Sequence, residues 1–500
     1  PSAMQVLLQF IHRHVEFGVP ELDSLLELAG VVPNEAYDHD AVDPTSPFIL
    51  LNLPSIDVVR AVCARMVLCR RIIELWGAGD TVEQLLEDVK SRNPSSVAAC
   101  SGEDTAWAMD VDFFGLKLSL SEKEAWRQRV IPSLDLRGPV RVHEPDAQLC
   151  LLGDVGDPTE CGARAREERP VKRLFLGRLL GEGQRHLADI FSCKKRPFIG
   201  PTSMDAELSF IMTNIVQARP GTTVYDPFAG TGSLLIAATH QGAHALGADI
   251  DWRILWPEKT GKGPTCLFTN FDHYGLPYPE VLRVDLSRPP YRDGMKVDGI
   301  VCDPPYGIRA GARKTGTTER KGQASKRPRD DGAEEEEQEE DGASEEDGAT
   351  AGSAEAKSHA VANRQYDAVD ILADLFDLAA SRLVVGGRLV FWMAVLNSYT
   401  ADDLPDHACF TRLSASAQQL STVYSRVLLC YRKDRDYDPA LRAQWREHVI
   451  GQLGPAFRNL RDVCFLAAER RKRRRKEKYE KRKAWVEREK SKEAAGVRLS

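Results

Sequence analysis

The chain has 500 residues, of which 42% are hydrophobic and 28% are charged. This length exceeds what one hydrophobic core usually organises, so we expect several domains, and the composition excludes a wholly disordered or fibrous chain. The formal net charge of -7 argues on its face against a nucleic-acid partner. That average hides two opposed blocks, because residues 330–347 hold twelve carboxylates and no basic residue, whereas residues 470–492 hold fourteen basic residues and four acidic ones.

The region up to residue 85 alternates strand and helix signals. Apolar periodicity predicts a strand, a helix, a strand and a long helix, at residues 7–15, 21–29, 48–53 and 57–76. This order is typical of a small α+β domain, which we assign to residues 1–85. The weaker strand signals of residues 86–200 indicate a second α+β or β-rich module with a linker. The linker is basic, and its Lys194, Lys195 and Arg196 are candidates for contacts with nucleic-acid phosphates, with a solvated surface as the alternative.

Residues 201–437 give the clearest pattern, in which strand and helix alternate. Helices are predicted at residues 207–217, 233–241 and 365–382. Strands are predicted at residues 223–225, 243–249, 281–284, 299–302, 388–394 and 426–433. Such alternation predicts an α/β domain with a mostly parallel sheet and helices on both faces. Ligands of these sheets bind at the carboxyl ends of the strands, near the topological switch point.

Two further segments lack this pattern. Residues 309–362 are rich in Gly, Ala, Ser, Lys and Glu and poor in large apolar residues, so we interpret them as a disordered insertion. Residues 438–500 give helical signals that lead into the basic tail. The longest apolar stretch, residues 389–396, is well short of the ~18 residues that suggest a membrane span, and we expect no membrane association. The 11 cysteines are scattered without a zinc-site spacing, which favours reduced thiols and no metal site.

A glycine-rich turn lies between a predicted strand and a predicted helix. It reads Asp226-Pro227-Phe228-Ala229-Gly230-Thr231-Gly232. The glycines allow a tight turn and close approach of the backbone to a ligand, and the following helix directs free N–H groups toward it. No Gly-Lys-Ser/Thr follows, so a P-loop is not predicted.

Acidic residues follow the next three predicted strands. Asp249 ends the second strand, where a carboxylate can bind both hydroxyls of a ribose, and Asp285 follows the third at a position suited to an adenine amino group. The fourth strand ends in Asp303-Pro304-Pro305-Tyr306. Four such features on successive strand ends favour a binding site over an accident of a structural domain.

Three other features have competing interpretations. Asp251 is an alternative ribose ligand, although a helix cap is favoured. His12 and His14 alternate along one strand without a third ligand nearby, which favours ordinary polar residues over a metal site. Cys302 adjoins Asp303 but lies in an apolar run, which favours a packed side chain over a nucleophile.

The two motifs together resemble those of Rossmann-like S-adenosylmethionine-dependent methyltransferases that modify exocyclic amines. Longer strings are similar to the eukaryotic tRNA guanosine-10 N2-methyltransferase catalytic subunit: Lys194-Lys195-Arg196-Pro197-Phe198, Cys-Asp-Pro-Pro-Tyr-Gly-Ile-Arg at residues 302–309, and Gly-Gly-Arg-Leu-Val-Phe-Trp-Met at residues 386–393. This resemblance implies a seven-stranded methyltransferase domain at residues 201–437, a ferredoxin-like domain at residues 1–85, and a THUMP RNA-binding module at residues 86–200. It also implies tRNA as substrate, a small zinc-binding activator protein as partner, and a cytoplasmic location, with the nucleus as the alternative that the basic tail suggests.

The resemblance assigns roles to the motif residues. Asp303 and the Pro304 carbonyl would accept hydrogen bonds from the guanine amino group, Pro305 would stiffen the turn, and Tyr306 would stack on a base removed from its helix. The cofactor, S-adenosylmethionine, would lie against Asp226, Pro227, Phe228, Gly230, Thr231, Gly232, Asp249 and Asp285. The alternatives are an exocyclic-amine methyltransferase acting on another RNA or on DNA adenine, and an RNA-binding scaffold without activity.

Overall fold

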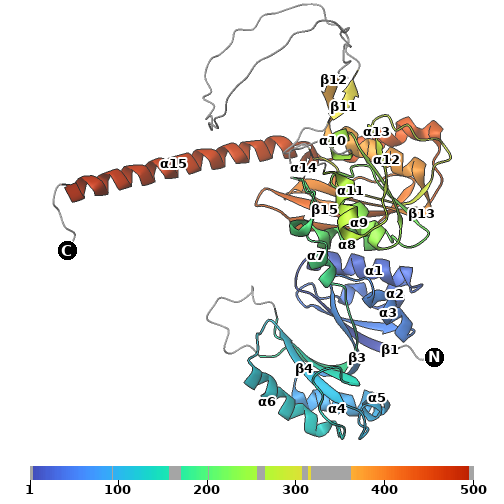
Figure 1. Ribbon diagram of the computed structural model, residues 1–500, viewed down its shortest axis with the longest axis vertical. Coiled ribbons are helices and arrows are strands. Elements are labelled where there is room, and N and C mark those ends of the chain that lie inside the picture. Colours follow the sequence, from blue (N-terminus) through green and yellow to red (C-terminus); the bar gives the residue numbers. More distant parts are fainter. Residues whose placement is uncertain are drawn as a thin grey trace, which may run out of the picture.

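The computed structural model describes residues 4–92, 94–156, 170–200, 202–255, 265–306, 313–316 and 362–494. Two large sheets organise most of these residues, one in the N-terminal module, residues 4–185, and one in the parallel-sheet domain, residues 202–433. In Figure 1 the N-terminal module lies below the parallel-sheet domain, and a long C-terminal helix projects from the latter.

The N-terminal module is built on one six-stranded sheet with the order β2-β1-β3-β6-β5-β4. The strands are β1 (Met4–Phe10), β2 (Phe48–Leu53), β3 (Cys69–Gly79), β4 (Trp107–Phe114), β5 (Ala147–Asp154) and β6 (Arg173–Glu182). All neighbours pair antiparallel except β4 and β5. The helices that pack on this sheet or beside it are α1 (Gly18–Leu28), α3 (Ile56–Cys63), α4 (Val82–Arg92) and α6 (Leu120–Val130).

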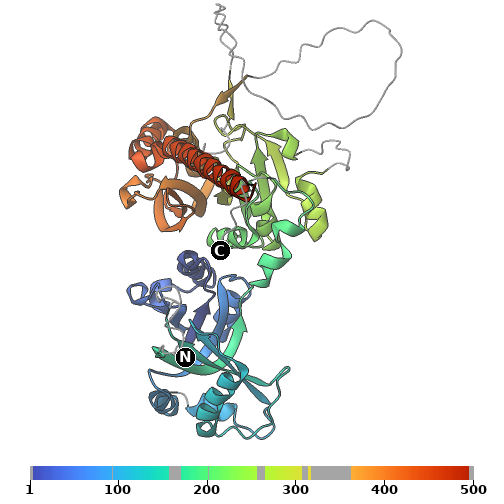
Figure 2. The same ribbon diagram turned by 90° about the vertical axis from the view of Figure 1, so that its left-hand side faces the viewer.

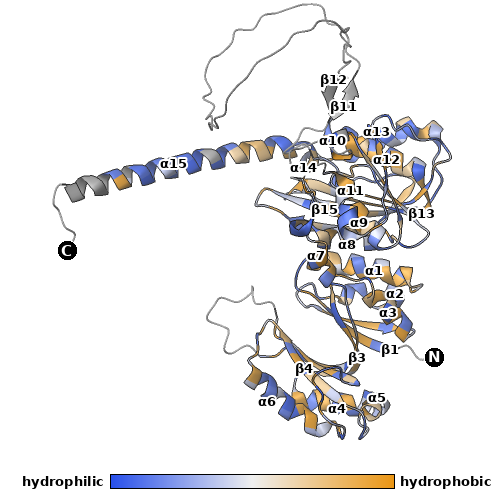
Figure 3. Cartoon of the chain, viewed as in Figure 1, coloured by the Kyte–Doolittle hydropathy of each residue, from blue (hydrophilic) through white to orange (hydrophobic). Residues whose placement is uncertain are grey.

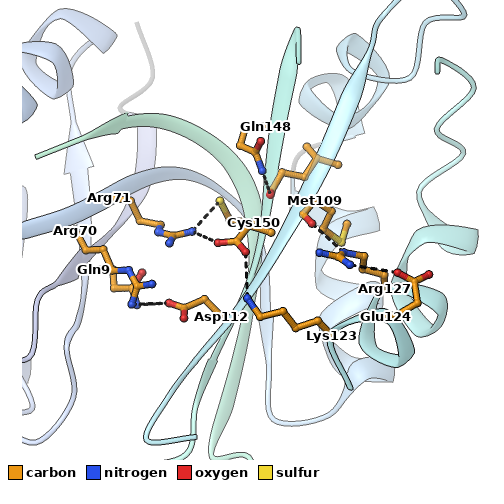
Figure 4. A network of polar contacts seen from close by, with 12 residues as sticks. Gln9, Arg70, Arg71, Met109, Asp112, Lys123, Glu124, Arg127, Gln148 and Cys150 are labelled. Carbon is orange, nitrogen blue, oxygen red and sulfur yellow. Dashed lines mark hydrogen bonds and ion pairs between the residues drawn. The ribbon is translucent and has the colours of Figure 1, made fainter. Parts of the chain in front are cut away.

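Polar contacts hold the two halves of this sheet together. Arg71 of β3 donates to Asp110 of β4 at 2.8 Å, and Asp112 of β4 accepts from Gln9 of β1 at 3.1 Å and pairs with Arg70 at 2.9 Å (Figure 4). The boundary predicted between residues 85 and 86 lies within α4, inside a single sheet-based body. The division into a ferredoxin-like and a THUMP part therefore stays a prediction.

One predicted element of this module is wrong. The long helix expected at residues 57–76 is a short helix, α3, followed by the strand β3. Strand β3 pairs with β1 on one side and β6 on the other and is buried on both faces. Such a strand carries apolar residues at consecutive positions, so it lacks the alternation that distinguishes a strand from a buried helix.

The parallel-sheet domain has a seven-stranded sheet with the order β14-β15-β13-β10-β7-β8-β9, as the fold-class prediction expected. Its strands are β7 (Thr223–Asp226), β8 (His244–Asp249), β9 (Glu280–Arg283), β10 (Val297–Cys302), β13 (Leu383–Leu396), β14 (Phe410–Gln419) and β15 (Tyr424–Lys433). Strands β9, β8, β7, β10 and β13 run parallel, and β15 lies antiparallel between β13 and the edge strand β14. Strand order reverses between β7 and β10, which places the expected ligand crevice there.

Helices cover both faces of this sheet. Helices α8 (Ala206–Ile215) and α9 (Ser233–His240) share a core with Val390 and Trp392 of β13. Helices α12 (Ala368–Arg382) and α13 (Arg442–Gln452) share the opposite core with Phe391 and Met393, the alternate residues of the same strand. The edge strand β14 was not predicted, because its side chains are mostly exposed or half-buried and carry little apolar signal.

The N-terminal module is fastened to the α8 side of this sheet. Arg388 of β13 is only 4% exposed, and its guanidinium donates to Ser24 Oγ of α1 at 2.9 Å and to the Ile215 carbonyl at 2.8 Å, and it pairs with Glu27. The ring of Phe17 packs edge-on against Trp392 at 5.4 Å between centroids. A buried charge with three partners fixes the orientation of the two bodies.

Two peripheral elements remain. Strands β11 (Arg313–Gly316) and β12 (Ala362–Gln365) pair antiparallel at the two ends of the predicted insertion, whose residues 317–361 lie outside the described residues. Helix α15 (Leu460–Ala494) contacts the domain near its start and projects away from it in Figure 1, and in Figure 2 it points toward the viewer. Its projecting part is largely hydrophilic (Figure 3), and among the described helices none has the length and apolar character needed to cross a membrane.

Candidate active site

The glycine-rich turn joins the end of β7 to the start of α9. Gly230 and Gly232 have φ values of 48° and 83°, in the left-handed region that favours glycine. Among the described residues, a Cβ on Gly230 would have only the Phe228 carbonyl within 4 Å, at 3.8 Å, so it would project into open space before the loop. A Cβ on Gly232 would contact Leu267 at 3.0 Å. Gly230 therefore keeps a cradle open, and Gly232 allows close packing.

Asp226 shapes this turn from within. Its side chain is 2% exposed and accepts the Phe228 N–H at 2.9 Å. Burial, together with the nearby carboxylates of Asp249 and Asp303, raises the pKa of Asp226 well above its ordinary value. Its place in the fold fits a bracing residue behind the loop better than a direct ligand contact.

Two further carboxylates follow β8 and β9 as predicted. Asp249 accepts the Gly230 N–H at 3.0 Å and the Asp251 N–H at 2.8 Å, while burial raises its pKa. Asp285 accepts both the N–H and the hydroxyl of Ser287, at 2.9 and 2.7 Å. Each of these side chains is held in one orientation while remaining partly exposed.

Asp251 has a different role. Its carboxylate accepts the Arg253 N–H at 3.1 Å and pairs with the Arg253 guanidinium at 2.7 Å, and the hydrogen bond to that guanidinium lowers its pKa. Asp251 thus caps the short helix α10 (Trp252–Leu255), which is the interpretation the sequence favoured.

These residues fit S-adenosylmethionine. The open space before Gly230 leaves room for the methionine part, and the N-terminus of α9 directs backbone N–H groups toward an anionic group there. Asp249 and Asp285, at the next two strand ends, match a ribose and an adenine in the order in which that cofactor carries them.

The Asp-Pro-Pro-Tyr motif follows β10, beside the reversal of strand order. The hydroxyl of Tyr306 donates to the Asp303 carboxylate. Burial raises the pKa of Asp303 to about 6, and the positive charge of Arg426 opposes this rise. Cys302 is fully buried, and burial raises the pKa of its thiol, which supports the packed-side-chain interpretation over a nucleophile.

Sequence reasoning missed one residue of this site. The Arg426 guanidinium lies over the Trp392 ring at 4.1 Å from its centroid, and its Nε donates to Gln418 Oε1 at 2.8 Å. Arg426 begins an otherwise apolar run in β15. An isolated charge at that position was a usable signal, but its neighbours come from β13 and β14, distant in sequence.

The predicted phosphate contacts need one correction. Arg196 is 6% exposed, and its guanidinium donates to Ser233 Oγ at 2.5 Å and to the Phe191 carbonyl at 3.2 Å. It therefore braces the first turn of α9 instead of facing solvent. Lys194 and Lys195 are exposed, so the prediction of RNA contact narrows to these two residues.

The two histidines of the first strand region have no metal-site geometry. His14 Nδ1 lies 2.9 Å from Gln418 Nε2, and its Nε2 lies 3.6 Å from Glu207 Oε2. Across the part of the chain that the structure describes, no group of three or more His, Cys, Asp or Glu side chains could hold a metal ion.

Comparison with known proteins identifies the family of this chain. Residues 4–185 match the family described as the Tmrp11 THUMP N-terminal domain, and residues 193–319 match the family described as the RMKL-like methyltransferase domain. The chain is 33% identical over 449 residues to the tRNA (guanine(10)-N(2))-methyltransferase TRMT11 of Mus musculus, covering 87% of this chain and 90% of that protein. The human protein of the same name is 34% identical over 446 residues, covering 86% and 89%.

Among solved structures, TrmN from Thermus thermophilus is 16% identical with a TM-score of 0.38, covering 86% of this chain and 99% of that one. That similarity is too low to add to the assignment, which rests on the sequence relatives. Their identity and coverage, together with a cofactor cradle and an Asp-Pro-Pro-Tyr turn on one sheet edge, show that this chain belongs to the family of S-adenosylmethionine-dependent tRNA (guanine(10)-N(2))-methyltransferases.

Proposed function

We propose that this chain is the catalytic subunit that methylates N2 of guanosine 10 in tRNA, with Asp303, Pro304, Pro305 and Tyr306 as its reactive turn. The observation that carries the proposal is the position of Asp303 at the end of β10, beside the switch point and across from the glycine cradle. S-adenosylmethionine, when bound, supplies an electrophilic methyl group on its sulfonium.

The task of the protein is to make a poor nucleophile reactive. The lone pair of the guanine amino group is delocalised into the ring. Hydrogen bonds from that group to the Asp303 carboxylate and the Pro304 carbonyl would turn the lone pair toward the methyl group. Asp303 would take the proton released when the N–C bond forms, and positioning would supply much of the rate acceleration. Tyr306 would stack on the base once it has left its helical pairing.

The most direct test is mass spectrometry of nucleosides from tRNA that has been incubated with the enzyme, its activator and S-adenosylmethionine. We expect N2-methylguanosine among the nucleosides, and the masses of nuclease fragments of the same tRNA should place the added methyl group at position 10. Unmodified tRNA, or a methyl group on adenine, would contradict the proposal.

We further propose that tRNA contacts the basic surface of the linker and the N-terminal module. Lys194 and Lys195 are exposed near the glycine loop, and a cavity of about 200 Å³ in the N-terminal module is lined in part by Arg13, Arg70 and Arg185. Cationic side chains of this kind bind phosphates without reading sequence. The double variant Lys194→Ala/Lys195→Ala should weaken tRNA binding in a filter assay while leaving kcat at saturating tRNA unchanged. Unchanged affinity at low salt would contradict the role.

A small zinc-binding activator protein is the proposed partner, by resemblance to the family. Co-expression with the activator should raise methyl transfer, and the two chains should elute together in size-exclusion chromatography. Full activity of the isolated chain would contradict this part of the proposal.

We propose a cytoplasmic location, and imaging of the full chain and of a variant without α15 would test the nuclear alternative.

A further inference from the structure

The sheet assigns different sides of Asp303 to cofactor and substrate. The strands that carry the cofactor residues, β7, β8 and β9, lie on one side of β10, whereas β13, β15 and β14 lie on the other. If S-adenosylmethionine occupies the first side, as the proposed function requires, the target base approaches Asp303 over the second. Side chains at this edge of β13 and β15 are therefore candidates for reading the base.

Arg426 is the cation held at that edge. In the sheet it lies opposite Ala394 of β13 on one side and Gln418 of β14 on the other. Its guanidinium stacks on Trp392, which is fully buried, and its Nε is bound by Gln418. Gln418 is in turn held by His14 of the N-terminal module, with 2.9 Å between Nε2 and Nδ1. A planar group that is stacked on one face and hydrogen-bonded at one edge is preorganised for binding.

Most N–H groups of the Arg426 guanidinium have no hydrogen-bond partner among the described residues. It has five N–H groups, and its Nε bond to Gln418 is the only hydrogen bond it makes with the described residues. The positive charge of Arg426 opposes the rise that burial causes in the pKa of Asp303, so the two charges interact, yet no ion pair joins them. The strand register places them at the same end of the sheet, because Cys302, next to Asp303, pairs with Phe391 of β13, and Arg426 pairs with Ala394, three residues further along that strand.

The acceptor Asp303 and the donor Arg426 together match the hydrogen-bonding groups on the Watson–Crick edge of guanine, and they do not match those of adenine. The Watson–Crick edge of guanine carries two donors, N2 and N1, followed by the acceptor O6, whereas adenine carries a donor amino group where guanine has O6. A base taken out of its stack is read on this edge. A carboxylate that accepts from N2 leaves O6 to be met by a donor.

We propose that Arg426 donates a hydrogen bond to O6 of the target guanine and thereby selects guanine over adenine at a motif that suits either amine. This inference rests on the proposed function. It makes Arg426 a specificity-determining residue that contacts the substrate.

A double-mutant cycle tests the contact. The enzyme, with its activator, is given tRNA that carries either guanine or 2-aminopurine at position 10, and kcat/KM is measured for the wild type and Arg426→Met. 2-Aminopurine keeps the 2-amino group and lacks O6; it also lacks the N1 proton, but that loss is common to both enzymes and cancels in the cycle. We expect Arg426→Met to lose about 10- to 100-fold with guanine, as for a hydrogen bond to a charged donor, and less than about threefold with 2-aminopurine.

Arg432→Met is the matched control, because Arg432 lies on the same strand and its Nε binds Asp434 at 2.7 Å, away from Asp303. It should behave as the wild type with both bases. If Arg426→Met does not fold, as judged by calorimetric binding of S-adenosylmethionine, Arg426→Lys enters the cycle in its place and should show the same base dependence with a smaller loss.

Two results would overturn the inference: equal losses with the two bases, or no loss with guanine. Neither would affect the proposed function, provided that the wild type methylates the guanine tRNA. If the wild type did not methylate tRNA with guanine at position 10, the result would contradict the proposed function and therefore also this inference.

Discussion

At the scale of single residues, burial sets the pKa of Asp303, the proposed proton acceptor. Asp303 sits in a partly buried turn next to the fully buried Cys302, and its pKa is raised to about 6, so a fraction of the enzyme carries a protonated, inactive carboxyl group in mildly acidic solution. In the proposed mechanism the active form accepts hydrogen bonds and is the carboxylate. We therefore expect activity to be lost as pH falls through the folded-state pKa.

We expect kcat/KM to rise about tenfold per pH unit below pH 6 and to level off above it, since the deprotonated fraction of Asp303 follows this course.

Asp303→Asn should lower kcat by roughly 100-fold or more, through loss of the proton acceptor. It should also abolish the fall of kcat/KM below pH 6. S-adenosylmethionine affinity, measured by calorimetry, should change little. A variant that kept full activity would show that Asp303 is not the acceptor.

Glycine 230 allows a second test at this scale. Gly230→Ala places a methyl group in the open cradle and in a left-handed conformation, so we expect weaker S-adenosylmethionine binding in calorimetry. Gly221→Ala is the matched control, because Gly221 also has positive φ, 82°, with nothing within 4 Å of an added Cβ, and lies before β7. Both variants should lose about 1 kcal/mol of stability from backbone strain, and only Gly230→Ala should lose affinity. Equal affinities would place the cofactor elsewhere.

At the scale of elements, the interface between the two bodies depends on a buried arginine. Arg388→Met removes the partners of Glu27 and the Ile215 carbonyl, so we expect a loss of about 2–4 kcal/mol, reduced from the fully buried case because Glu27 is 36% exposed. This loss should be measured as a lower midpoint of thermal unfolding. Arg60→Met, whose pair with Asp57 is exposed, should shift the midpoint little. Equal midpoints for the two variants would mean that the apolar contacts alone hold the interface.

The sequence predicted features that depend on local patterns and missed features that depend on contacts between distant segments. The turn after β7 and the acidic residues after β8, β9 and β10 are local patterns, so their places in the fold were predictable, although their ligand contacts stay predictions. Strand β3 was predicted as a helix because burial on both faces removes alternation. The burial of Arg196 and the stacking of Arg426 depend on partners from distant segments, which periodicity does not report.

At the scale of the whole molecule, the net charge of -7 is a poor guide to the partner, because charge of opposite sign is segregated along the chain. Helix α15 presents its basic residues away from the body, with exposed aromatic side chains at Tyr479 and Trp485. Truncation after Ala468 should weaken tRNA binding at low salt and flatten the dependence of log Kd on log salt, because fewer counterions are released. Fluorescence anisotropy at several salt concentrations would measure this slope. An unchanged slope would leave α15 without a part in RNA binding.

The paired strands β11 and β12 give the insertion that interrupts the parallel-sheet domain a closed stem. Four register pairs, Arg313 with Gln365 through Gly316 with Ala362, bring its two ends together before residues 317–361 begin. The entropy of closing a loop grows only with the logarithm of its length, so each doubling costs about 0.6 kcal/mol once the ends are held. The stem therefore sets where the insertion departs from and rejoins the parallel-sheet domain, only a few residues after the Asp-Pro-Pro-Tyr motif.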